Sequence, residues 1–146
     1  MTNVEELAPF VGRWHSRGRT VATPTASAVE VEGTDVYEWF PGGKFLVHHV
    51  DVLIGGRPVR VIELIGDPDP AVGGALRMRS FDNDGRFAEM RATVDADGVW
   101  TLTEGVATRS TVVFGPDGQT MTANWERATH DGTWEPWMVM RFTRAS

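Results

Sequence analysis

The sequence predicts an all-β protein in which about ten strands form a closed, up-and-down antiparallel barrel behind one short N-terminal helix. Apolar residues mostly alternate with polar ones from Val11 onward, which is the period of strands with one buried face. Turn residues interrupt this pattern at short intervals, and no segment is long enough for the helix that must connect parallel strands. Ten meandering strands left open would expose two long edges, and closing the sheet removes both.

We expect the elements in the following order. Thr2 or Asn3 caps a short helix that runs to about Phe10, with Glu5 and Glu6 in its first turn, where the helix dipole favours negative charge. Turns such as Asn83-Asp84-Gly85 supply the positive φ angles of tight hairpins. The predicted strands are residues 11–22, 28–40, 43–54, 58–66, 74–82, 86–95, 98–104, 107–115, 119–128 and 134–143.

Length and composition restrict the class of protein. We expect one domain over residues 1–146, because a chain of this length buries about two thirds of its unfolded surface without covalent staples. The absence of cysteine excludes disulfides and thiolate sites and fits a cytoplasmic protein. The net charge of -6 opposes binding to nucleic acid. No stretch approaches the ~20 apolar residues of a membrane helix, so we expect no membrane association.

Two motifs carry a resemblance to a known family. Gly12-Arg13-Trp14 follows the predicted helix, and Tyr37 to Leu46 contains a strand, a Pro-Gly-Gly turn and the next strand. In this order the chain resembles the small bacterial lipocalin-like proteins of unknown function, which are calycin barrels similar to nitrobindin and fatty-acid-binding barrels. The resemblance implies that Trp14 plugs one barrel end. A late arginine, Arg141 or Arg144, is expected to stack on its ring, and Arg141 is assigned to the plug.

The resemblance implies a fold and no activity, because one fold hosts unrelated functions. Haem-binding relatives depend on a barrel histidine near the carboxyl end, but the only late histidine here is His130, in a predicted turn. His48, His49, Asp51 and Glu63 are the only cluster of candidate metal ligands, and adjacent strand residues cannot easily hold one ion. We therefore expect neither a metal nor another cofactor.

Strand alternation assigns five apolar or aromatic candidates to the barrel interior. These candidate ligand-binding residues are Tyr37, Trp39, Trp125, Met138 and Met140. Flat rings and flexible thioethers form an adaptable surface for a hydrophobic ligand. The alternative is that the same side chains simply fill the core of a small barrel. The tenth strand adds Trp134 to the inward set.

His48 and His49 are neighbours on one strand and must point to opposite faces. His48 is expected inside because it shares its face with more apolar residues. Glu63 interrupts an apolar run on the next strand and could meet His48. Such a pair would form a general base with an orienting carboxylate. A purely structural hydrogen bond, or a solvent-facing Glu63, is the alternative.

Arg79 is a further polar candidate for the interior. If Phe81 points inward, Arg79 does so too, and a buried guanidinium could bind a ligand carboxylate or neutralise Glu63. The alternative is a solvent-facing stripe formed by Arg77 and Arg79.

Motifs that would identify a nucleotide-binding protein, a serine hydrolase or a zinc protease are absent. We expect the barrel to bind a small apolar or aromatic molecule, with His48 or Arg79 anchoring one polar group. The first alternative is a cofactor-independent enzyme of secondary metabolism, a cyclase or isomerase, with His48 as base and Glu63 as its partner. The second is a protein-interaction module with a filled barrel. Trp137 and Phe40 are expected outside, which leaves a homodimer open.

Overall fold

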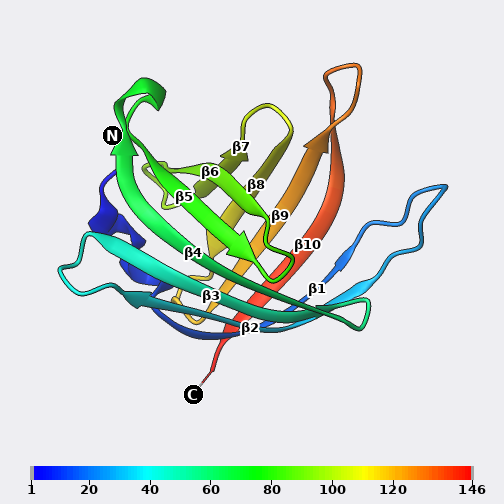
Figure 1. Cartoon of the computed structure of the whole chain (residues 1–146), viewed down its shortest axis with the longest axis horizontal. Helices are drawn as coiled ribbons and strands as arrows, with labels where there is room; N and C mark the ends of the chain where they lie inside the picture. The colour runs from blue at the N-terminus through cyan, green and yellow to red at the C-terminus, as the bar shows by residue number, and fades with distance from the viewer. Residues whose placement is uncertain (1, 146) are drawn as a thin grey trace.

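The computed structural model describes residues 2–145 and shows a closed antiparallel barrel with a short 3-10 helix at its start (Figure 1). Each strand pairs with its neighbours in sequence, and β1 pairs with β10 to close the ring. The predicted fold class is therefore confirmed. Among the described residues, the ten strands are β1 (Gly12–Thr20), β2 (Glu30–Trp39), β3 (Phe45–Ile54), β4 (Arg57–Asp69), β5 (Ala75–Asp82), β6 (Phe87–Val94), β7 (Trp100–Glu104), β8 (Thr108–Phe114), β9 (Thr120–Ala128) and β10 (Trp134–Arg144).

Strand β4 is longer than its sequence predicts. The break expected at residues 66–74 contains the end of β4 and a second 3-10 helix, η2 (Pro70–Val72). The β4–β5 register shifts between Gly66 and Pro68. A bulge at this point lets β4 continue to Asp69 instead of ending at Gly66. Asp67 lies in this bulge with φ 58, a left-handed conformation that aspartate tolerates better than most residues.

One end of the barrel is closed by helix η1 (Val4–Phe10). The backbone N–H of Asn3 donates to Glu6 Oε1 at 2.9 Å and so begins the helix. Leu7 and Phe10 are buried, and the Trp14 indole N–H beneath them donates to the Phe10 carbonyl at 2.8 Å. Trp14 is fully buried, so it lies where a plug was expected.

The arginine on the Trp14 ring is Arg144, and the assignment of Arg141 is wrong. The Arg144 guanidinium carbon lies 4.2 Å from the ring centroid. Arg144 is directly opposite Trp14 in the β1–β10 register, whereas Arg141 is opposite Arg17 on the outer face. Arg144 also donates to the carbonyls of Pro9 at 2.7 Å and Val11 at 2.6 Å, which joins β10 to the end of η1.

A second bulge reverses part of β10. The β9–β10 register shifts within residues 136–138, so residues before the shift face the opposite way from simple alternation. Trp134, predicted inside, instead lies outside, with the Arg109 guanidinium 4.1 Å from its ring centroid. Trp137, predicted outside, packs edge-on against Trp125 with their centroids 6.0 Å apart.

Candidate functional site

The barrel encloses a cavity of about 310 Å³ with mainly apolar walls. This volume lies at the small end of the range typical of ligand pockets, about 300 to 1,000 Å³. All five methionines within residues 2–145 line it: Met78, Met90, Met121, Met138 and Met140. Their side chains do not fill the interior, so the barrel is hollow.

The two ends of the cavity differ in their exposure to solvent. Leu7 and Phe10 of η1 are buried and close one end. At the other end, Ile54 and Val59 line the cavity and are only partly buried. Figure 1 shows η1 and the long connection between β1 and β2 at opposite ends of the barrel. The route to solvent therefore lies at the end opposite η1.

Three charged side chains form the polar part of the cavity wall: Asp35, His48 and Glu63. We call them the inner cluster. They come from the adjacent strands β2, β3 and β4, and His48 lies directly opposite Glu63 in the β3–β4 register. His48 Nδ1 lies 2.9 Å from Glu63 Oε1, and His48 Nε2 lies 2.6 Å from Asp35 Oδ2. One imidazole thus bridges two carboxylates.

Two further side chains hold the inner cluster in place. The Ser16 hydroxyl of β1 donates to Asp35 Oδ1. The Tyr37 ring stacks on the His48 ring, with centroids 3.9 Å apart and planes 8° from parallel. These contacts restrict the rotation of Asp35 and His48 and make the cluster a rigid part of the wall.

The environment of His48 favours its protonated form. Burial lowers its pKa, but hydrogen bonds to Asp35 and Glu63, together with their charges, outweigh this effect and raise the pKa from 6.5 to about 9. At neutral pH both ring nitrogens therefore donate, one to each carboxylate. Burial, and then the charges of Asp35 and Glu63, raise the pKa of Tyr37 well above its usual value, so its phenol stays neutral.

The structure brings together the two residues that the sequence predicted as a pair, His48 and Glu63. Sequence reasoning missed the third member, Asp35, and its donor, Ser16. Strand alternation places both side chains on the inner face of the sheet. A carboxylate on that face is costly to bury without a partner, and this is the signal that could have identified Asp35.

Four of the five predicted apolar ligand contacts line the cavity: Tyr37, Trp125, Met138 and Met140. Trp39 does not line the cavity, although it is partly buried and packs against the core. Trp39 is the last residue of β2, at the end of the barrel that η1 covers, and is therefore beyond the open volume.

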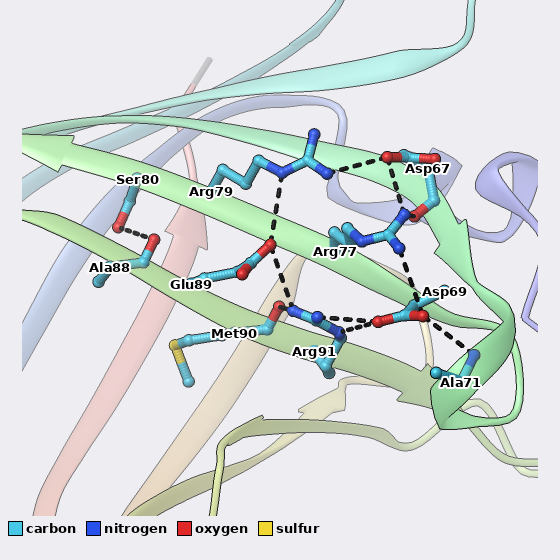
Figure 2. Close-up of polar contacts among 10 residues, drawn as sticks. All are labelled: Asp67, Asp69, Ala71, Arg77, Arg79, Ser80, Ala88, Glu89, Met90 and Arg91. Atoms are coloured by element: carbon cyan, nitrogen blue, oxygen red, sulfur yellow. Dashed lines mark hydrogen bonds and ion pairs between the residues drawn. The ribbon is translucent and has the colours of Figure 1, made fainter.

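The expectation that Arg79 anchors a ligand in the interior is wrong. Arg79 lies on the outer face of β5, where it bonds Asp67 Oδ2 at 3.0 Å and approaches Glu89 Oε1 at 3.4 Å (Figure 2). Phe81, two residues further along the strand, is 54% exposed, so this face of β5 points to solvent. Arg79 neither reaches the cavity nor neutralises Glu63.

Arg79 belongs to a second set of charges, which we call the outer network. It joins Asp67 and Asp69 of β4, Arg77 and Arg79 of β5, and Glu89 and Arg91 of β6 (Figure 2). Every arginine in it has a carboxylate partner, so three positive charges are matched by three negative ones.

Within residues 2–145, no group of three or more His, Cys, Asp or Glu residues is arranged to hold a metal ion. Both ring nitrogens of His48 already have carboxylate partners. His130 is exposed in the turn between β9 and β10. None of the described helices has the length and apolar character needed to cross a membrane.

Comparisons with known proteins identify the fold but no family. No family model matches the chain, and no curated protein does. The crystal structure of Rv2717c from M. tuberculosis has a TM-score of 0.68 at 15% identity, covering 98% of this chain and 97% of that one. The S-type phycobiliprotein lyase CPES from Guillardia theta has a TM-score of 0.59 at 13% identity, covering 99% and 94%. A de novo designed fluorescence-activating β-barrel has a TM-score of 0.50 at 16% identity, covering 99% and 100%.

Proposed function

We propose that this protein binds one small, largely apolar molecule inside the barrel, and that it is one of the small bacterial lipocalin-like proteins. The observation that carries the proposal is the cavity of about 310 Å³, lined by methionine and aromatic side chains. Side chains that line an empty cavity lack van der Waals partners on one side, which costs stability. A barrel selected only for stability would therefore have larger side chains that fill this volume. An apolar ligand would recover those contacts.

Two of the similar structures lend support, since one is described as a fluorescence-activating barrel and one as a phycobiliprotein lyase. Their identity to this chain is too low to transfer a ligand. We extend the proposal to a cytoplasmic location, which the absence of cysteine favours, and leave a homodimer open.

The alternatives have weaker support. An enzyme that uses His48 as a general base needs a ring nitrogen that is free to accept a proton, whereas Glu63 and Asp35 each occupy one ring nitrogen, and their hydrogen bonds raise the pKa of His48. A protein-interaction module needs no cavity. The geometry therefore favours a binding protein over both.

Binding of N-phenyl-1-naphthylamine, a neutral fluorophore that brightens in apolar surroundings, tests the proposal. We expect saturable binding with one site per chain. Ala123→Phe places a ring in the cavity and should abolish binding, whereas Asn124→Phe places the same ring on the exposed outer face of β9 and should leave binding intact.

Circular dichroism of each variant checks its fold. Should Ala123→Phe not fold, Val50→Phe introduces the same ring from β3 at a less tightly buried position of the wall. Equal binding by a folded cavity variant and by Asn124→Phe would place the fluorophore outside the barrel and overturn the proposal.

A further inference from the structure

We propose that the occupant of the cavity is an apolar molecule carrying one positively charged nitrogen, a hydrophobic amine, which the inner cluster binds. This inference rests on the proposed function and names its ligand class. It follows from the charge of the wall, from its unused hydrogen-bonding capacity and from the position of the arginines.

The charge of the cavity wall is negative. Asp35 and Glu63 supply two carboxylates, and the His48 imidazolium between them supplies one positive charge. The described residues that line the cavity include no lysine and no arginine. The inner cluster thus holds two acidic side chains against one basic one, which leaves an excess of negative charge in surroundings that are otherwise apolar. Such a charge is costly to bury unless a cation pairs with it.

The inner cluster also has one oxygen without a donor. Asp35 uses Oδ1 for Ser16 and Oδ2 for His48, so both of its oxygens are bonded. Glu63 uses Oε1 for His48, and no side chain or backbone N–H within residues 2–145 donates to its Oε2. Glu63 is 8% exposed and lines the cavity, so a donor inside the barrel can reach this oxygen. An ammonium group provides charge and donor together.

The same arrangement excludes the opposite ligand charge. A fatty acid or another carboxylate would meet two carboxylates in the wall and no cation able to pair with it, because His48 is already shared between Asp35 and Glu63. Three arginines on the neighbouring strands, Arg77, Arg79 and Arg91, cannot pair with a ligand carboxylate, because they lie on the outer face and already have carboxylate partners (Figure 2).

The rest of the wall suits the apolar part of such an amine. Five thioethers adapt to an irregular ligand, and the aromatic rings of Trp100 and Trp125 line the same volume. The amine would therefore lie against β2 to β4, with its hydrocarbon body extending across the barrel.

Three probes with one skeleton test the inference: 4-phenylbutylamine, 4-phenylbutanol and 4-phenylbutyrate. Each is titrated into the protein at pH 7 by calorimetry and by displacement of N-phenyl-1-naphthylamine. We expect the amine to bind about tenfold tighter than the alcohol, as for a charge-assisted hydrogen bond in a dry site, and the carboxylate to bind weakest. A carboxylate that binds as tightly as the amine would overturn the inference.

Glu63→Gln removes one charge while keeping the shape of the side chain and an acceptor for His48. We expect it to lose about tenfold in affinity for the amine and to keep its affinity for the alcohol and the neutral fluorophore. Glu89→Gln makes the same change in the outer network and should alter none of the three. An unchanged preference for the amine in Glu63→Gln would remove the inner cluster as its source.

The two proposals fail in distinguishable ways. If the fluorophore binds in the cavity but the three probes bind equally, the binding function stands and the ligand class is wrong. If neither the fluorophore nor any probe binds, the binding function itself is wrong.

Discussion

The inner cluster and the outer network are built from the same kinds of contact but differ in charge balance and in burial. The side chains of Asp35, His48 and Glu63 are 8 to 12% exposed and leave an excess negative charge. In the outer network five of the six side chains are 23 to 41% exposed and that of Asp69 is 8% exposed, and the three arginines balance the three carboxylates. Only the inner cluster thus retains both an unmet charge and a dry environment, which are the conditions for a ligand anchor.

The two sets of charges also respond to opposite ends of the pH scale. The pKa of His48 is raised, whereas hydrogen bonds from Arg79 and from Arg91 lower the pKa of Asp67 and of Asp69, respectively. The inner cluster therefore loses stabilisation on the alkaline side, and the outer network loses it on the acid side. This difference allows the two contributions to be measured separately in one protein.

The largest expected effect comes from removing the centre of the inner cluster. His48→Ala leaves two carboxylates facing a cavity without a counter-charge, and we expect the free energy of unfolding to fall by about 3 to 5 kcal/mol. Urea unfolding at pH 7 measures the change. Arg79→Ala removes the matching cation from the outer network and should cost several-fold less, because water screens the carboxylates it leaves. Similar losses in both variants would contradict the distinction between the two sites.

The second effect is a loss of stability at alkaline pH. The pKa of His48 is 6.5 in the unfolded chain and about 9 in the folded one, so the folded state holds the proton more tightly. This stabilisation is complete below pH 6.5, decreases as the pH rises and is lost above about pH 9. It amounts to roughly 3 kcal/mol, since one pKa unit corresponds to about 1.4 kcal/mol.

Urea unfolding between pH 6 and pH 10 should therefore show a slope in the wild type that is absent in His48→Gln. A histidine resonance that titrates near pH 9 by NMR, and disappears in the variant, would assign the slope to His48. Identical slopes in the two proteins would place its origin elsewhere.

A smaller effect separates two buried serines on the inner face. Ser16 donates to Asp35, whereas the Ser110 hydroxyl is buried without a partner among the described residues. Ser16→Ala leaves a charged acceptor short of one donor and should cost about 2 kcal/mol in unfolding free energy. Ser110→Ala removes an unmatched polar group and should be neutral or slightly stabilising. A comparable loss in both would indicate that packing, rather than hydrogen bonding, decides these positions.

The smallest effect is expected in the outer network at low pH. The lowered pKa of Asp69 means that its stabilisation is present at neutral pH and is lost as the pH falls through the folded value. Asp69→Asn should therefore flatten the acid side of the stability profile slightly and leave the alkaline side unchanged. Thermal melts between pH 3 and pH 7 measure this, and a change on the alkaline side would show that the two charge sets are coupled.

A site residue could be predicted from the sequence where its position depends only on one hairpin and its turn. His48 and Glu63 were predicted together because they lie on adjacent strands joined by the tight Gly55-Gly56 turn, which aligns the hairpin. Trp134 was misplaced because a bulge reverses its face; the alternation does not mark this bulge, but Pro136 lies at it and lacks the N–H that a regular ladder needs. Arg79 was misplaced because its inward assignment depended on that of Phe81, which the structure places on the exposed face of β5.

The sequence by itself determined the number and order of the strands, the closure of the barrel and the burial of Trp14. Alternation and turn chemistry are local properties, and in an up-and-down sheet each strand pairs with its neighbour in sequence. The tertiary structure decided that the barrel is hollow, that Asp35 completes the inner cluster and that the arginines lie outside. These features depend on how side chains from all ten strands share one interior volume, which no single strand encodes.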